Sequence, residues 1–234
     1  EIVAPATVQY LLLQHVKTVG IGNLVGESCG LWVRNDASLK NATIYKCSFE
    51  SASYGIYTQK ANGGSGTVTD VKISGCTFLN NTGKGLYAEK LSNVSITGCT
   101  FTNNGNIAYW HKDWNAGVDI NLKYGAYQDI VIDNNTFTGN GNCSKEGVAL
   151  TVKARDDGGY AGNPASLDGV TITHNYFDGN ERSIRIGEPG KNNATPSNVE
   201  IAFNDFMGTT GCSTGGSPIA DVLNFTQSGL TANA

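Results

Sequence analysis

Apolar and polar residues alternate along most of this chain in two recurring patterns. The first is V-x-I-x-x-(C/N)-x-F, and six segments follow it: 42–49, 71–78, 94–101, 130–137, 170–177 and 199–206. The second starts with Gly or Ser and alternates over the next four residues, at 30–34, 55–59, 85–89, 117–121, 147–151 and 183–187. Alternation with a period of two is typical of a strand with one buried face. Each repeat therefore predicts two or three short strands joined by turns.

The spacing between repeats varies, which decides the architecture. A unit this small cannot bury its apolar side alone, so copies must stack, and each strand then pairs in parallel with its copy in the next unit. A coil tolerates inserted residues in its turns, whereas a propeller requires a fixed period. The pattern predicts an all-β, single-stranded right-handed parallel β-helix of about 7–9 rungs. We expect residues 1–29 to form a degenerate first rung or cap with Val19 inward, 30–208 the helix, and 209–234 a last rung or tail.

Stacked repeats place equivalent side chains in columns. The last position of the first pattern predicts an internal stack of rings, formed by Phe49, Phe78, Phe101, Phe137, Phe177 and Phe206. The column beside it holds Cys47, Cys76, Cys99, Asn135, Asn175 and Asn204. Asn residues there should satisfy buried backbone groups through chained amides. The cysteines should stay free, because neighbours about 4.8 Å apart exceed the separation that a disulfide needs. The state of Cys29, Cys143 and Cys212 stays open.

On these repeats and ladders, residues 30 to 208 resemble the pectate-lyase-like superfamily of right-handed parallel β-helix proteins. That superfamily includes polysaccharide lyases, glycoside hydrolases, epimerases, phage tailspikes, adhesins and other surface proteins. The resemblance implies a fold. It implies no single activity, because the sequence carries no catalytic signature of one enzyme family.

Composition excludes several classes of protein. The formal net charge is −4 and no basic cluster occurs, so we expect no nucleic-acid partner. No apolar run approaches the roughly 18 residues of a membrane span, so we expect no membrane insertion. The 6 cysteines include no C-x-x-C pair, which excludes a zinc ribbon or a thioredoxin motif. Their even number fits an oxidising compartment, and an extracellular or cell-surface location is expected.

Candidate chemistry lies on the outward positions of the second pattern, which in register are Trp32, Tyr57, Tyr87, Asp119, Ala149 and Arg185. The aromatic part of this column either stacks on successive sugars or only packs on itself. The charged part includes Glu89, Asp119, Lys123, Lys153, Arg155 and Arg185, with Ala149 leaving a notch between Asp119 and Arg185. If the chain is an enzyme, the candidate catalytic residues are Asp119, Lys153 and Arg185. A cation that neutralises a uronate carboxylate acidifies the adjacent C–H for β-elimination. Otherwise these charges only pair across rungs.

Two insertions flank this face, 106–115 and 154–168. Trp110 and Trp114 in the first either extend a carbohydrate-binding edge or fold back over the coil. Lys123 adds a cation for acidic sugars. Asp156, Asp157 and Asp168 could offer oxygen ligands to Ca²⁺, but no calcium-binding motif is present, so we predict neither a metal site nor a cofactor.

These features favour an extracellular or cell-surface β-helix module with a structural, self-assembling or adhesive role that binds polysaccharide along its aromatic face. The alternative is a polysaccharide lyase or related enzyme acting on acidic glycans. Whether the chain is catalytic stays open. The sequence predicts no amphipathic helix that caps the first rung, and uncapped strand edges invite another chain. The expected partners are therefore a polysaccharide and, at the ends, either a second copy or the rest of a longer parent chain.

Overall fold

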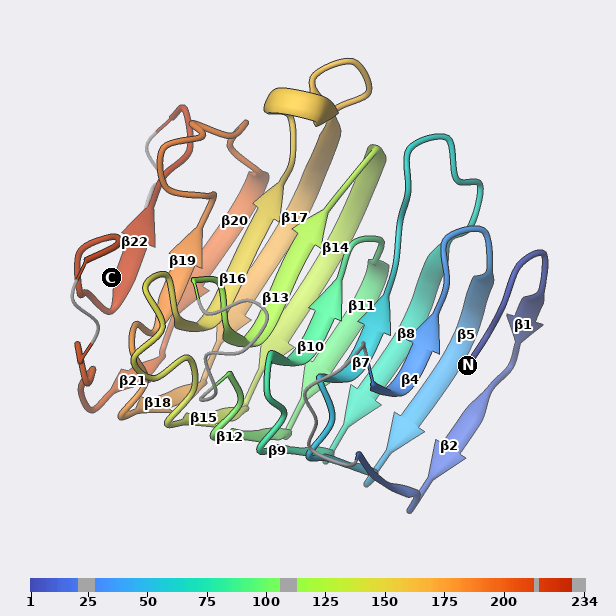
Figure 1. Cartoon of the computed structure of the whole chain (residues 1–234), viewed down its shortest axis with the longest axis horizontal. Coiled ribbons are helices and arrows are strands. Elements are labelled where there is room, and N and C mark those ends of the chain that lie inside the picture. Colours follow the sequence, from blue (N-terminus) through green and yellow to red (C-terminus); the bar gives the residue numbers. More distant parts are fainter. Residues whose placement is uncertain (21–27, 106–112, 213–214, 229–234) are drawn as a thin grey trace.

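The computed structural model describes residues 1–20, 28–105, 113–212 and 215–228, and these coil into three parallel sheets (Figure 1). The first sheet contains β4 (Cys29–Val33), β7 (Tyr54–Thr58), β10 (Lys84–Ala88), β13 (Ala116–Leu122), β16 (Val148–Ala154), β19 (Ile184–Ile186) and β22 (Val222–Asn224). Its strands follow one another in this order across the sheet. Each turn of the coil therefore adds one strand beside the previous one.

The other two sheets repeat the same order. The second sheet contains β1 (Thr7–Gln9) and β2 (Leu12–Gln14), which both pair with β5 (Ser38–Tyr45), followed by β8 (Val68–Ser74), β11 (Ser92–Thr97), β14 (Gly125–Asp133), β17 (Ala165–Thr173) and β20 (Ser197–Ala202). The third contains β3 (Lys17–Val19), β6 (Ser48–Glu50), β9 (Thr77–Leu79), β12 (Thr100–Thr102), β15 (Thr136–Thr138), β18 (Tyr176–Asp178) and β21 (Asp205–Phe206). A single short 3-10 helix, Gly158–Tyr160, is assigned in the described residues. The predicted parallel β-helix is confirmed, with a 7-stranded first sheet within the expected range of rungs.

The predicted ring stack forms inside the coil. Consecutive phenylalanines stack with ring centroids 4.5–5.2 Å apart, along Phe49, Phe78, Phe101, Phe137, Phe177 and Phe206. The second pattern begins with glycine because these rings need the space. A Cβ at Gly55 would lie 2.8 Å from the ring of Phe78 and 2.5 Å from the carbonyl oxygen of Gly85.

Asparagine ladders accompany the rings. The predicted one is present: Asn135 donates to Asn175, and Asn175 donates to Asn204, each at 3.0 Å. A second ladder that the sequence analysis missed runs through Asn81, Asn104, Asn140 and Asn180, with amide-to-amide distances of 2.8–3.0 Å. Cys47, Cys76 and Cys99 are buried free thiols, as predicted.

Two sequence-based placements are wrong. Ala149 does not face outward, because Asp119 pairs with Thr151 and Ala149 lies in the hydrophobic core. Ala149 occupies the small-residue position beside Gly117, and Thr151 takes the outward place. Val19 does not face inward. It exposes 61% of its surface, while Thr18 pairs with Phe49 at the end of the ring stack.

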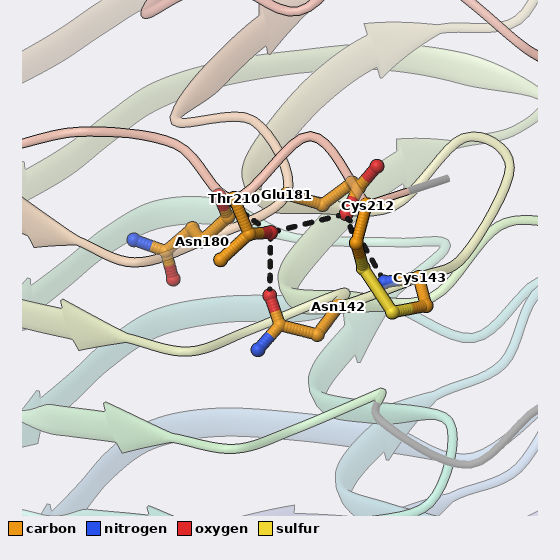
Figure 2. Close-up of a disulfide and its surroundings, with 6 residues drawn as sticks. All are labelled: Asn142, Cys143, Asn180, Glu181, Thr210 and Cys212. Carbon is orange, nitrogen blue, oxygen red and sulfur yellow. Dashed lines mark hydrogen bonds between the residues drawn. A yellow bond between two sulfur atoms is a disulfide. The ribbon is translucent and has the colours of Figure 1, made fainter. Parts of the chain in front are cut away.

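A disulfide joins Cys143 to Cys212, which the sequence left open (Figure 2). Beside it lies Glu181, a fully buried carboxylate that accepts hydrogen bonds from the Cys143 N–H (3.0 Å) and the Thr210 hydroxyl (3.2 Å). Thr210 also contacts Asn142 at 3.0 Å. The disulfide and this carboxylate together fix the segment after β21 to the turn before β16.

Candidate functional site

A polar pocket of about 180 Å³ lies on the outer face of the first sheet, over β10, β13 and β16. It is lined by Tyr54, Lys84, Tyr87, Trp114, Asp119, Asn121, Lys153, Arg155 and Glu188. Val118 and Ile120 pack into the core, so the alternation of β13 turns Asp119 and Asn121 outward. The structure thus brings Asp119 and Lys153 of the predicted catalytic group into one pocket.

Asp119 is the centre of a chain of ion pairs. Its carboxylate lies 2.6 Å from the Lys84 ammonium and 3.5 Å from that of Lys153. Lys153 in turn lies 3.4 Å from Glu188, which also pairs with Arg155 at 3.0 Å. Four successive rungs therefore contribute alternating charges to one connected network.

Burial and charge shift the pKa values of this network in defined directions. Burial raises the pKa of the Asp119 carboxyl, but the positive charges of Lys153 and Lys84 outweigh burial and hold that pKa well below its usual range. Burial lowers the pKa of the Lys153 ammonium to about 8, although Asp119 acts in the opposite direction. Asp119 is therefore an anion at neutral pH, whereas Lys153 releases its proton in mildly basic solution.

Several buried polar atoms at this face have no hydrogen-bond partner within the structure. They are Oδ1 of Asp119, Oδ1 of Asn121, Oγ1 of Thr151 and Nε of Arg185. A buried polar atom without a partner costs about 1–3 kcal/mol, so such atoms are normally satisfied by water or a ligand. Asp119 and Asn121 both line the pocket, which marks it as a place where a polar guest would complete the hydrogen bonding.

Arg185, the third predicted catalytic residue, is not part of the pocket lining and lies on the next strand, where it pairs with Thr151. Its guanidinium donates to the backbone oxygen of Glu146 at 2.9 Å and pairs with the Glu146 carboxylate at 3.3 Å. Its charge still contributes to the low pKa of Asp119. Arg185 therefore influences the pocket through its positive charge, which stabilises the Asp119 anion.

Lys123 is also engaged in an ion pair within the protein. Its ammonium forms an ion pair with Glu89, and Glu89 accepts a further hydrogen bond from the Tyr87 hydroxyl at 2.8 Å. Asn121 donates to the same hydroxyl at 3.1 Å. Lys123 thus orients Tyr87 at the pocket wall through Glu89.

The aromatic ladder forms in the predicted register, and its rings stack on one another. The ring of Tyr57 lies 5.7 Å from that of Trp32 and 4.8 Å from that of Tyr87, at angles of 18° and 16°. Cations cover the ends of the stack, with Arg34 at 4.4 Å from the Trp32 ring and Lys84 at 3.6 Å from the Tyr87 ring. Tyr57 consequently has neighbours on both faces, and the ladder presents ring edges rather than faces.

Trp114 is the third aromatic residue in the pocket lining, beside Tyr54 and Tyr87. Lys153 and Arg185 lie over its ring, at 5.5 and 5.6 Å from the centroid. Trp110, predicted in the same insertion, lies outside the described residues.

Comparison with protein families gives one result. A model described as "Right handed beta helix region" matches residues 23–218, which is most of the chain. The chain belongs to the right-handed β-helix family. Comparisons with curated proteins and with solved structures gave no match. The handedness and the fold are therefore shown, while the chemistry of this β-helix rests on its own residues.

Two members of the pocket, Lys84 and Glu188, were not predicted from the repeats for a simple reason. Lys84 directly precedes Gly85, and Glu188 directly follows Gly187, so both fall one residue outside the positions compared between repeats. A comparison extended by one residue on each side would include them. Tyr54 lies three residues before Tyr57 and enters the pocket because Lys84 pairs with it across the sheet.

The aspartates considered for calcium are engaged by the β-helix itself. Asp156 accepts from Asn193, Asp157 pairs with Arg155 at 2.7 Å, and Asp168 accepts from Ser197 at 2.6 Å. Within the described ranges, no three His, Cys, Asp or Glu side chains come together in a way that could hold a metal ion. Nor do those ranges contain a helix with the length and apolarity of a membrane span.

Proposed function

We propose that this β-helix binds an acidic saccharide chain and holds one sugar unit in the Asp119 pocket. The observation that carries the proposal is a pair of buried acceptors in the lining that make no hydrogen bond, Oδ1 of Asn121 and Oδ1 of Asp119, the latter lying 3.5 Å from the Lys153 ammonium. Sugar hydroxyls are donors that would satisfy both atoms. The pocket wall contains Tyr54, Tyr87 and Trp114, and aromatic rings beside a few directed polar groups are typical of small-molecule sites.

The charges of the lining favour a guest with a negative group. Among the lining side chains, the cations Lys84, Lys153 and Arg155 outnumber the carboxylates Asp119 and Glu188 by one, while Asp157, outside the lining, also pairs with Arg155. Arg155 donates two hydrogen bonds to Asp157 and pairs with Glu188 at 3.0 Å, so a uronate carboxylate would accept from the N–H groups of Arg155 that remain. The saccharide proposed here is therefore one that carries uronate units.

An extracellular or cell-surface location is part of the same proposal. The Cys143–Cys212 disulfide supports it, because disulfides persist in oxidising compartments. In such a location the β-helix would meet polysaccharides of a cell wall or surface layer.

Binding of defined oligosaccharides, measured by calorimetry at several salt concentrations, tests the proposal. Wild-type protein should bind uronate oligomers, and binding should weaken with salt because dissolved ions screen the attraction between the charged oligomer and the pocket as it approaches. Arg155→Gln should weaken uronate binding at least tenfold and leave neutral oligomers unchanged, whereas Trp114→Ala should weaken both. Lys72→Gln, an exposed lysine away from this pocket, is the matched control. Absence of binding across uronate and neutral oligomers would refute the proposal.

A second candidate function is β-elimination on the same saccharide, favoured by the lowered pKa of Lys153. A neutral Lys153 amine would take the proton beside the uronate carboxylate, and the resulting electron pair would form a C=C bond. The glycosidic C–O bond would break with its electron pair on the departing oxygen, which would take up a proton from water. Products with unsaturated ends should then absorb ultraviolet light, at a rate that rises with pH around 8. Lys153→Gln should abolish the absorbance, and a wild type that binds without producing it is a binding module alone.

A further inference from the structure

The two ends of this β-helix match each other in register. The first rung consists of β1, β2, β3 and β4, and the last consists of β20, β21 and β22 (Figure 1). Ile2 already bridges Val33 at the outer edge of β4, so the match concerns the second and third sheets. Among the described strands, none pairs with the outer edge of β3 or of β21. We propose that β20 and β21 of one copy pair in parallel with β1, β2 and β3 of a second copy, in the register of the internal repeats. This inference is independent of the saccharide proposal.

Opposite charges meet in that register. The third sheet aligns Lys17 with Ser48, and the same column continues through Thr77, Thr100, Thr136 and Tyr176 to Asp205. Adding one more rung beneath Asp205 therefore brings Lys17 of the next copy beside it. Asp205 is exposed, and Lys17 keeps 59% of its side chain exposed although it pairs with Glu50.

Exposed apolar side chains meet in the same register. Met207 follows Phe206 and occupies the column that begins at Val19, and these two expose 64% and 61% of their surface. In the second sheet, Ile201 occupies the column of Leu13. Leu13 and Ile201 are only partly buried although they face the core. A second copy would complete the burial at each position.

An aromatic position also continues across the junction. Phe203 exposes 76% of its surface and stacks on His174 at 5.4 Å. His15 stands at the equivalent turn of the first rung, directly after β2, where it packs on Tyr45. The ring of Phe203 would therefore lie between His174 of its own chain and His15 of the next. One column opposes the match, because Glu200 would face the exposed Leu12.

The strand direction determines how copies join. Every strand pair in the three sheets is parallel, so a copy that continues them must be added by translation along the axis, with unlike ends in contact. Such a heterologous contact does not close on itself and generates a filament rather than a dimer. Like ends cannot form it, because one copy would then be reversed and its edge strands would run antiparallel to those of the other.

Charge reversal at the two positions tests the junction. Wild-type protein should form end-to-end oligomers that grow with concentration in sedimentation velocity. Lys17→Asp alone places two aspartates at the junction, and Asp205→Lys alone places two lysines there, so each variant should associate at least tenfold more weakly. An equimolar mixture of the two variants should assemble again, since every contact in an alternating filament then joins Asp to Lys. The double variant should also assemble.

Two controls separate assembly from folding and from net charge. Circular dichroism and thermal melting should be unchanged in all variants, because both side chains lie at the surface. Lys72→Asp makes the same charge change in the middle of the rod and should assemble like wild type. A wild type that stays monomeric up to millimolar concentration, or single variants that assemble as well as wild type, would overturn the proposal, as would a mixture that fails to recover.

Discussion

The carboxylate of Asp119 on β13 and the ammonium of Lys84 on β10 lie 2.6 Å apart, with 1% and 6% of their side chains exposed. Such a pair is costly to form because both charges lose their hydration, but it is more costly to break, because one charge is then left buried alone. The same carboxylate also faces Lys153, so its loss would leave two cations without their central anion. The polar pocket therefore depends on Asp119 for stability as well as for chemistry.

We predict that Asp119→Asn lowers the free energy of unfolding by about 3–5 kcal/mol, the range found when one partner of a buried ion pair is removed. Urea unfolding followed by circular dichroism measures this. Asp70→Asn, at an exposed position within β8, should change stability by less than about 0.5 kcal/mol. Equal effects of the two substitutions would contradict the network described around Asp119.

The pKa of Lys153 predicts a pH dependence of stability. Its folded pKa of about 8 lies below the ~10.4 of an exposed lysine, so between these values the unfolded chain holds a proton that the folded chain has released. Stability then rises with pH, by about 1 kcal/mol per pH unit near pH 9.

The measurement is the difference between wild type and Lys153→Met across pH 8 to 9.5, in which the contributions of other groups cancel. The rise attributed to Lys153 should be missing in the variant. Lys72→Met should keep the wild-type slope, because Lys72 is exposed. Parallel stability curves for wild type and Lys153→Met would show that Lys153 keeps an ordinary pKa.

The ring stack predicts a contrast between two phenylalanines. Phe101 is fully buried between Phe78 and Phe137, so Phe101→Ala should cost about 3–5 kcal/mol of stability. Phe203 lies outside the stack and is exposed, so Phe203→Ala should lower the free energy of unfolding by less than about 1 kcal/mol. A cost below about 1 kcal/mol for Phe101→Ala would mean that the stack contributes little.

The disulfide should stabilise the last rungs. Cys143 and Cys212 are 69 residues apart in the sequence. A disulfide that closes a loop of that size stabilises the folded state by about 2–5 kcal/mol, because it restricts the unfolded chain. The variant Cys143→Ser/Cys212→Ser should therefore melt at a lower temperature than oxidised wild type. Dithiothreitol should lower the melting temperature of wild type to that of the variant, and should not affect the variant itself.

The columns of the β-helix were predictable because alternation and repeat length act on every rung. Aromatic, asparagine and cysteine positions follow directly from the repeated pattern. The predicted register was wrong at β16, where the glycine is not equivalent to the glycines that begin the other repeats. Gly147 looks like the start of a strand, but its N–H bonds to Ser144 in the preceding turn, and the small-residue position belongs to Ala149.

The candidate site was predictable only in part. Asp119 and Lys153 emerged because they lie on outward positions of the repeats, but the sequence does not show which neighbours engage a charged side chain. Lys123 pairs with Glu89, and Arg185 with Glu146, and both contacts depend on side-chain directions across rungs. The aromatic ladder shows the same limit. The repeats predicted which rings are neighbours, but they did not show that other rings and cations cover the ring faces.

The asparagine ladders make the interior of the rod electrically directional. In both ladders the Oδ1 of each amide accepts from the preceding rung. Each Nδ2 donates one hydrogen bond to a backbone carbonyl of the preceding rung and, where the ladder continues, one to the Oδ1 of the following rung. The carbonyl dipoles of the side-chain amides therefore point the same way along the axis, as peptide carbonyls do along an α-helix. Their negative ends point toward the first rung and their positive ends toward the last, so a charged group at either end experiences a field set by residues deep inside the coil.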